Sequence, residues 1–451
     1  MSSSTEELSG FGLAGRSASV VRSMTAAELP DVLTTAGDRG SIARGLGRAY
    51  GDPATNGGGQ VVRLTGATAV SIDAASRSVT AGAGVSLDEL LRILVPAGWF
   101  VPVTPGTRFV TVGGAVASDI HGKNHHVDGS FGTHVTRLRM MLADGSTVEV
   151  GPDRDPTLFW ATVGGMGLTG IILDVTFRVF PIETSRVVVD TYRLPDLDSV
   201  MTRMVETEST ARYSVAWIDL MARGRHLGRG VLTNGDHASR EQFTGGRGDP
   251  LAYGPRRPVG LPPVVPTRGV INRASVAAFN EFWFRSAPIG RSEELQEIAA
   301  YFHPLDAVDG WNRVYGRRGF VQYQFVVPDS EVDVLCRIVE RFSASRLPIF
   351  LVVLKRFGPG NPAPLSFPMS GWQLAVDVGA AHDILPTLLR EFDELVLEAG
   401  GRHYLAKDFH ADPSVVRRGY PQLDAWLEVR RRVDPNGVWQ SDMSRRLGLT
   451  P

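Results

Sequence analysis

Four side chains that can bind protons, phosphate or metals fall within one short stretch. His121, Lys123, His125 and His126 lie in IHGKNHH, in a chain that has 10 histidines. The histidine spacing could supply a metal site, but no acidic residue stands at helical spacing, and glycines on both sides indicate a loop. We therefore expect no metal. His121 and Lys123 are the candidates for chemistry, whereas His125 and His126 are expected to be polar supports of the turn.

A second segment, ARGLGRAYGD at residues 43–52, has the composition of a phosphate-binding loop. Its glycines permit positive φ and leave backbone N–H groups unobstructed, and Arg44 and Arg48 add positive charge. A nicotinamide-binding fingerprint would need a third glycine where Tyr50 stands, and a helix where DPATNGGGQ follows. The segment therefore predicts phosphate binding and does not favour a nicotinamide cofactor.

Glycine recurs in two further passages. GGMGLTG, residues 164–170, matches G-x-G-x-x-G literally, but it follows an apparent helix and precedes a strand, the reverse of the dinucleotide-binding order. PGTRFVTVGGAVASDIHG, residues 105–122, joins its glycines through small residues. One such passage alone is more typical of a set of turns. Three of them flanked by strands favour backbone that lies directly against an extended ligand.

Bulk composition narrows the classes of protein. A chain of 451 residues is longer than single cores usually grow, which predicts two domains. The net charge of −1 gives no electrostatic case for nucleic acid as a partner. The N-terminus lacks a basic region followed by a long apolar run, and no stretch approaches the ~18 apolar residues of a membrane-spanning helix. We expect cytoplasmic synthesis and, at most, peripheral contact with a membrane.

The hydrophobic pattern supplies the elements that position these residues. Short β-type runs are expected at 60–66, 69–73, 78–85, 137–150 and 170–180, and later at 320–327, 349–358 and 371–378. A helix begins after Ser86, with Glu89 completing a capping box, and another is capped at Asp196 or Asp198. Few helices among strands predict an α+β region, and a new unit begins near residue 185.

Residues 244–270 concentrate Gly, Pro and Arg, a composition that predicts a long loop. Leu251, Tyr253, Leu261 and Val264 stand among arginines there, so the loop could touch a membrane. A disordered insertion without a role is the alternative.

Three segments, in their order along the chain, carry a family resemblance. RGLGRAYGD, PGTRFVTVGGAVASDIHGKNHH and LFWATVGGMGLTGIILDVTF resemble the FAD-binding domain of vanillyl-alcohol oxidase type flavoproteins. Within that superfamily the chain is similar to the decaprenylphosphoryl-β-D-ribose oxidases, through SGFGLAG, GFVQYQFVVP, KRFGPGNPAPLSFP, YLAKD and SDMSRRL as well. The resemblance implies a two-domain α+β flavoprotein. Residues 1–184 and 402–451 would form the FAD-binding domain, and 185–401 a substrate domain with an antiparallel sheet.

The resemblance implies a set of cofactor contacts. Ala43, Arg44, Gly45, Leu46, Gly47, Arg48, Ala49, Tyr50, Gly51, Asp52, Gly106, Thr111, Val112, Gly113, Gly114, Ser118, Asp119, Ile120, His121, Ile172 and Tyr404 would line FAD. Many relatives tether the flavin through a histidine or cysteine, and GLGRAYG has neither. We expect non-covalent FAD, with His121 as the one local candidate for a tether.

Oxidation of a secondary alcohol needs a group that takes the hydroxyl proton or stabilises an alkoxide. By resemblance, Lys407 and His121 are the candidates, with Tyr50 near the same edge. Lys407 could act as a base with a lowered pKa or remain a cation that stabilises negative charge.

Seven residues match substrate positions of the family: Lys123, Trp217, Gln322, Gln324, Lys355, Gln373 and Ala375. Cations and amides suit a phosphate and sugar hydroxyls. Gln322 and Gln324 should share one face of a strand, with Tyr323 on the other. Ala375 stands where cysteine is common in mycobacterial relatives, so inhibitors that need that thiol should form no adduct.

The resemblance implies oxidation of the ribose 2′-hydroxyl of decaprenylphosphoryl-β-D-ribose to a 2′-keto intermediate. This is the first half of an epimerisation that makes the arabinose donor for cell-wall arabinan. A separate NAD(P)H-dependent reductase would complete it. The alternatives are a sugar-lactone or alditol oxidase of the same superfamily, and a non-catalytic flavoprotein that presents residues 244–270 to a partner.

Overall fold

Two N-terminal sheets support the glycine-rich segments. The computed structural model describes residues 2–243, 248–261, 266–267, 269–289 and 292–450. A four-stranded sheet has the order β1 (Ser2–Ser9), β2 (Arg16–Met24), β4 (Gln60–Leu64), β3 (Ser41–Ala43). A five-stranded antiparallel sheet has the order β5 (Val70–Asp73), β6 (Ser78–Gly82), β10 (Ile171–Arg178), β8 (Val135–Met141), β9 (Thr147–Val150). The strands predicted in this half of the chain are therefore confirmed.

Capped helices pack against these sheets, and the first of them begins where the capping box at Ser86 predicts it. In α2 (Leu87–Leu94) Ser86 and Glu89 form the capping box, and the leucine stripe is buried in the core. Helix α3 (Val112–Ala117) is N-capped by Thr111, and α5 (Pro156–Thr162) by Asp155. Short helices α1 (Asp31–Thr35) and α4 (His125–Asp128) and a small pair, β7 (Trp99–Phe100) with β11 (Phe180–Pro181), complete this half.

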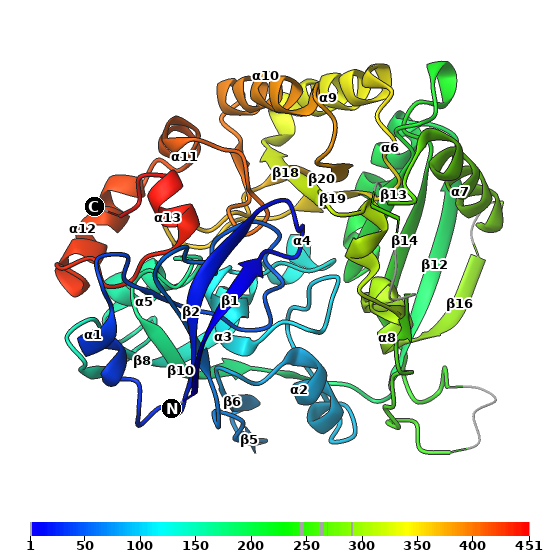
Figure 1. The fold of residues 1–451 in the computed structure, drawn as a ribbon. Helices are drawn as coiled ribbons and strands as arrows, with labels where there is room; N and C mark the ends of the chain where they lie inside the picture. The colour runs from blue at the N-terminus through cyan, green and yellow to red at the C-terminus, as the bar shows by residue number, and fades with distance from the viewer. Residues whose placement is uncertain (1, 244–247, 262–265, 268, 290–291, 451) are drawn as a thin grey trace.

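An eight-stranded antiparallel sheet occupies the second half (Figure 1). Its order is β16 (Ser292–Glu297), β12 (Arg186–Leu194), β14 (Gly230–His237), β13 (Tyr213–Ile218), β19 (Val352–Phe357), β20 (Gly371–Gly379), β18 (Phe320–Val327), β21 (Arg402–His403). The helices of this half are α6 (Leu197–Thr207), α7 (Arg273–Ser286), α8 (Ile298–Phe302), α9 (Val332–Ser345) and α10 (Leu385–Glu398). Asp196 caps α6, which confirms one of the two predicted caps.

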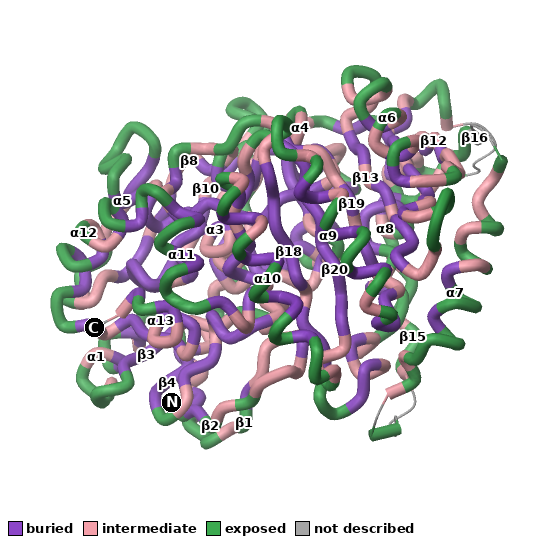
Figure 2. Tube along the Cα trace, turned by 90° about the horizontal axis from the view of Figure 1, so that it is seen from above, coloured by how far each residue is buried: buried purple, intermediate pink, exposed green. Residues whose placement is uncertain are grey.

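The two faces of this sheet differ in chemistry because side chains alternate along each strand. One face, which we call the core face, packs Tyr323, Leu354 and Leu374 into a cluster with residues of α6, α9 and α10. The other face carries the polar side chains discussed below. The central strands are buried along most of their length, as the tube in Figure 2 shows.

The chain returns at its end to the first sheets. Helix α11 (Pro413–Gly419) contacts α10 and β21, and α12 (Leu423–Val433) and α13 (Asp442–Arg446) lie beside α5 and the N-terminal strands (Figure 1). The Trp426 indole N–H donates to the Ala161 carbonyl at 2.8 Å, and Asp442 accepts hydrogen bonds from the Ser17 hydroxyl and the Gly57 N–H, both at 2.8 Å. The Arg446 guanidinium also pairs with the Asp52 carboxylate at 2.6 Å, which joins the end of the chain to the segment that we predict to bind phosphate.

The predicted loop at 244–270 is irregular where it can be described. Residues 244–247, 262–265 and 268, with Val264 among them, lie outside the described residues. Val259–Gly260 form β15, which pairs with β17 (Val308–Asp309). Leu251 and Tyr253 are half-buried and pack against a hydrophobic core cluster, and contact of this loop with a membrane stays a prediction. Within the described ranges, no helix is long and apolar enough to cross a membrane.

Candidate active site

One face of the eight-stranded sheet gathers most of the predicted substrate residues, and we call it the site face. Gln322 and Gln324 alternate with core residues on β18, and Tyr323 points to the core, as predicted. Gln324 is registered opposite Ala375, and Gln373 opposite Lys355. Trp217 lies on β13, where its register partner is Val353 of β19. Strand pairing therefore brings together residues that are up to 158 positions apart, as from Trp217 to Ala375.

The site face contains buried polar atoms with no hydrogen-bond partner among the described residues. Gln373 is fully buried, and neither its amide oxygen nor its amide nitrogen has a hydrogen bond. Buried polar groups are nearly always satisfied, because each unsatisfied one costs about 1–3 kcal/mol. The amide of Gln373 is therefore available to a ligand.

Lys407 lies beside Tyr50 at the edge of this face. Its Nζ sits 3.4 Å from the centroid of the Tyr50 ring. The Tyr50 N–H donates to the Ala406 carbonyl at 2.9 Å, which fixes the two segments together. Burial lowers the pKa of Lys407 and raises that of Tyr50. Among the described residues the Lys407 ammonium has no hydrogen-bond acceptor, so it is free to meet a substrate oxygen.

His121 is held as a neutral ring. Its Nε2 accepts a hydrogen bond from the Gln324 amide at 2.9 Å, and its ring contacts Phe357, Phe367 and Tyr404. Burial, followed by the charge of Lys355, places the pKa of His121 well below its ordinary value. The buried Nδ1 has no partner. His121 can therefore donate from Nδ1 to a ligand, while its Nε2 is already occupied.

Two further lysines give the site its positive charge. The Lys123 ammonium donates to the Tyr301 carbonyl at 2.5 Å and lies 3.8 Å from the centroid of the Tyr301 ring. Burial, followed by the charge of Lys355, lowers the pKa of Lys123 to about 7. Burial lowers that of Lys355 to about 8. In the described structure the Lys355 ammonium has no acceptor, so it is the cation that is free to bind an anion.

The segment 43–52 fits the pyrophosphate of a dinucleotide cofactor. The consecutive N–H groups of residues 45–49 donate to no acceptor in the described protein. Gly47 has φ +64°, and a Cβ on Gly45 would lie 2.3 Å from the Thr111 hydroxyl, so both positions require glycine. Leu46 is 52% exposed. A run of free N–H groups is the arrangement that binds phosphate oxygens.

The side chains of several other predicted cofactor residues form contacts within the protein. The Arg44 guanidinium donates to the Ser9 and Ala54 carbonyls, and Asp52 forms an ion pair with Arg446. The Arg48 guanidinium lies over the rings of Phe11 and Phe109. The guanidinium of Arg44 is therefore already engaged within the protein, and its contact with phosphate stays a prediction. The carboxylate of Asp119 accepts hydrogen bonds from the Ser130 hydroxyl, the Gly132 N–H, the Asn361 amide and the Ser366 hydroxyl.

The rest of that set lines the same region mainly through backbone. Val112, Ile120 and Ile172 belong to the hydrophobic core. Ala43 ends β3, Gly51 follows Tyr50, and the Gly113 and Gly114 N–H groups donate to the Ala83 carbonyl and the Thr111 hydroxyl. Gly106 has open space at its Cβ position. The Tyr404 hydroxyl donates to the Ser118 carbonyl at 2.8 Å, which places its ring next to His121.

The expected loop at IHGKNHH is wrong at its C-terminal end. His125 and His126 begin helix α4, because the Asn124 amide donates to Asp128 at 2.6 Å and closes a helical turn. Both nitrogens of His125 are buried without partners, and its ring lies 4.4 Å from that of Phe357. Burial lowers the pKa of His125 to about 3. His126 bonds the Ala211 carbonyl, and no cluster of three metal-binding side chains occurs in the described ranges.

Sequence reasoning missed Asp377. This fully buried carboxylate follows Gln373 and Ala375 on the site face of β20, and its Oδ1 accepts a hydrogen bond from the Gln322 amide at 2.5 Å. The signal was present, because the alternation that pairs Gln322 with Gln324 also continues from Gln373 through Ala375 to Asp377.

Comparison with known proteins identifies the family of the chain. A model of the FAD binding domain matches residues 17–151, and one described as D-arabinono-1,4-lactone oxidase matches residues 380–447. The decaprenylphosphoryl-β-D-ribose oxidase of Mycolicibacterium smegmatis is 43% identical over 99% of this chain and 98% of its own. The chain belongs to the decaprenylphosphoryl-β-D-ribose oxidase family.

Two further relatives are less similar to this chain. A protein of Streptomyces coelicolor, described only as uncharacterized, is 39% identical over 81% of this chain and 100% of its own. The alditol oxidase of a Streptomyces species is 24% identical over 95% of both chains. Membership of the oxidase family makes this chain an FAD-dependent oxidoreductase with the two-domain α+β architecture of the vanillyl-alcohol oxidase type. It favours the main interpretation over an alditol or lactone oxidase.

Proposed function

We propose that the protein oxidises the 2′-hydroxyl of a polyprenylphosphoryl-β-D-ribose, decaprenylphosphoryl-β-D-ribose by family, to the 2′-keto compound. The observation that carries this proposal is the presence of two lysines, each without a hydrogen-bond acceptor among the described residues. Lys355 lies on the site face beside the unpaired amide of Gln373, and Lys407 lies over Tyr50. A phosphate needs the first group and an oxidisable hydroxyl needs the second, and a free alditol would leave Lys355 unused.

Residues of the chain accept the hydroxyl proton in this reaction. The chemistry that FAD supplies when bound is acceptance of a hydride from the alcohol carbon. Because burial lowers the pKa of Lys407, a neutral amine is accessible near neutral pH and can take the hydroxyl proton at Nζ. His121 cannot do so at Nε2, because that atom accepts from Gln324. The neutral His121 ring instead orients the substrate through Nδ1.

An anaerobic titration tests the proposal. The FAD-loaded protein is mixed with a short-chain polyprenylphosphoryl-ribose or with a free alditol, and the visible flavin absorbance is followed. We expect bleaching by the phosphoryl-ribose and none by the alditol at the same concentration. Bleaching by the alditol alone would replace the proposal with an alditol oxidase.

We further propose that the keto product passes to a separate NAD(P)H-dependent reductase, which completes an epimerisation that serves cell-wall arabinan synthesis. Family membership supports this step, since the keto compound is only half of an epimerisation. Incubation of the oxidase with substrate should give the 2′-keto compound and no arabinose epimer by mass spectrometry and NMR. Formation of the epimer by the oxidase alone would contradict the need for a partner.

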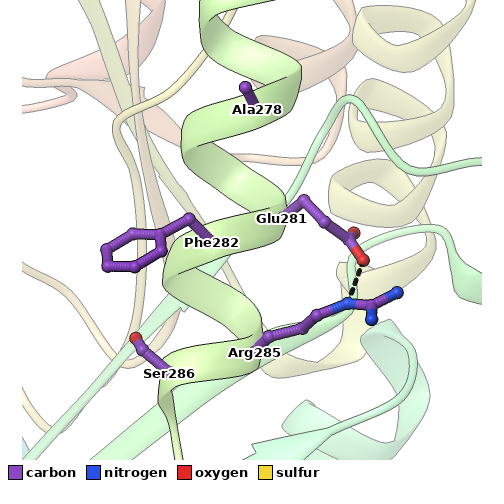
Figure 3. Close-up of a pocket in the computed structure, with 5 residues that line it drawn as sticks. All are labelled: Ala278, Glu281, Phe282, Arg285 and Ser286. Carbon is purple, nitrogen blue, oxygen red and sulfur yellow. Dashed lines mark hydrogen bonds and ion pairs between the residues drawn. The ribbon is translucent and has the colours of Figure 1, made fainter.

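We also propose that the protein meets its lipid substrate at a membrane surface through α7. The exposed Phe and Trp side chains of the described residues all lie on this helix, with Phe282 70%, Trp283 44% and Phe279 43% exposed. Phe282 borders a hollow of about 510 Å³, beside the ion pair of Glu281 with Arg285 (Figure 3). Aromatic and arginine side chains on one helix suit the interface of a bilayer.

Flotation with vesicles of mixed zwitterionic and anionic lipid tests this contact. Phe282→Ser with Trp283→Ser should reduce the bound fraction, while Val205→Ser, at an exposed apolar position of α6, serves as the matched control. Equal flotation of all three proteins would exclude α7 as the membrane contact.

A further inference from the structure

Asp377 is a buried carboxylate with half of its hydrogen-bonding capacity unused. Its side chain is fully buried in the middle of the site face, where burial raises its pKa. Oδ1 accepts from the Gln322 amide, whereas Oδ2 is buried and has no partner. A carboxylate in this position is costly unless another group compensates its charge.

A short chain of contacts links Asp377 to Lys407. Gln322 is registered directly opposite Asp377 and also acts on the pKa of Tyr50, whose ring lies under the Lys407 ammonium. The groups whose charge acts on Lys407 are Asp377, which favours the ammonium, and Lys355, which opposes it. The remaining titratable groups facing Asp377 are Tyr50 and Tyr315.

The other carboxylates near the Lys407 segment are already compensated. Asp408 is paired with Arg446 and His410, and Asp52 with Arg446. Asp377 is therefore the counter-charge left for Lys407 among the described residues.

We propose that Asp377 is a positioning residue that controls how strongly Lys407 holds its proton during alcohol oxidation. This inference rests on the proposed function. The hydroxyl O–H bond breaks and its proton passes to the neutral Lys407 amine, while the C–H electrons leave as the hydride that the cofactor accepts and a C=O bond forms. The ammonium produced in this step is stabilised by the Asp377 carboxylate, which acts across Tyr50 and Gln322.

The experiment measures Lys407 directly as well as turnover. Lysine acylation by a small amine-selective reagent is followed by peptide mass spectrometry across a pH series in the FAD-loaded protein, and the pH dependence of single-turnover flavin reduction is recorded beside it. In Asp377→Asn the midpoint of Lys407 labelling and the rising limb of the reduction rate should both move to lower pH, by about one unit or more, because an opposite charge is removed. Asp219→Asn, which removes a buried carboxylate bonded to Arg229 and Asn280, should move neither.

A second variant covers the case in which Asp377→Asn does not fold. Gln322→Leu keeps the carboxylate but removes its donor, so Asp377 is protonated more readily and the labelling midpoint should move in the same direction by less. Unchanged midpoints in every folded variant would overturn the proposal. If the wild type shows no flavin reduction while its labelling midpoint still depends on Asp377, the proposed substrate is wrong and the role of Asp377 stands.

Discussion

The two faces of the eight-stranded sheet place polar groups in equally buried positions but treat them in opposite ways. On the core face the Tyr323 hydroxyl lies 2.9 Å from His403 Nε2 and 3.1 Å from the Asp393 carboxylate, which in turn pairs with His410. On the site face Gln373 has no partner at all, and Asp377 has one unpaired oxygen. Tyr323 lies on β18, and Gln373 and Asp377 lie on the adjacent strand β20.

This difference separates a group that supports the fold from one kept for a ligand. Burial of a polar group is tolerated when its partners are built in, and it is costly otherwise. The basic side chains of this half also differ in their partners. Lys355 on the site face has no hydrogen-bond acceptor among the described residues. Arg229 is paired with Asp219 and Glu281. Family membership alone could not show which polar groups are available to a ligand, because that depends on which buried atoms lack a hydrogen bond.

The largest expected effect is on catalysis at the edge of the site face. Lys407→Ala should lower the rate of flavin reduction by about 10²–10⁴-fold, the usual contribution of a positioned acid or base. Stopped-flow absorbance measures the rate, and bound FAD is quantified from the released cofactor. A variant that keeps FAD and reduces it at the wild-type rate would remove Lys407 from the chemistry.

Removal of a polar group should change the free energy of unfolding in opposite directions on the two faces. Tyr323→Phe should lower the free energy of unfolding by about 1 kcal/mol, because it removes the hydroxyl that hydrogen-bonds Asp393 and His403. Gln373→Leu should raise it by about 1 kcal/mol, because it removes two unsatisfied buried atoms. Urea denaturation of the FAD-loaded proteins gives both values. Two losses of similar size would mean that Gln373 is satisfied in solution and that the faces do not differ.

The smallest expected effect is the dependence of stability on pH. Burial lowers the pKa of Lys355 from 10.5 to about 8, so between these values the unfolded chain binds a proton that the folded chain lacks, and stability rises with pH. Lys355→Met should flatten that rise. Asp393 is held well below its ordinary pKa of 3.8 by His403 and His410, despite burial, so its contribution is present above that value and is lost at lower pH.

Denaturation at a series of pH values distinguishes the two groups. Asp393→Asn should flatten the slope of the acid limb and leave the slope of the alkaline limb unchanged, and Lys355→Met should do the reverse. If both variants change the same limb, the assignment of the charges to the two faces is wrong.

Much of the site could be predicted from the sequence, and the limits have physical causes. The capping box at Ser86, the alternation around Tyr323 and the glycine-rich loop depend on local geometry that the sequence encodes directly. The partners of Arg44 and Asp119 could not be predicted, because they lie in segments distant along the chain. The strand pattern could have predicted that Asp377 lies on the site face. Its unpaired oxygen could not be predicted, because it depends on how distant segments pack around it.

Equilibrium binding tests the contrast between the faces most directly. The FAD-loaded wild type, Gln373→Leu and Tyr323→Phe are titrated under anaerobic conditions with the 2′-deoxy analogue of a short-chain polyprenylphosphoryl-ribose, which cannot be oxidised at that carbon. We predict that Gln373→Leu weakens binding about tenfold, equivalent to about 1.4 kcal/mol, while Tyr323→Phe leaves it unchanged. Equal affinities for all three proteins, or a loss confined to Tyr323→Phe, would contradict the claim that the unsatisfied face is the substrate site.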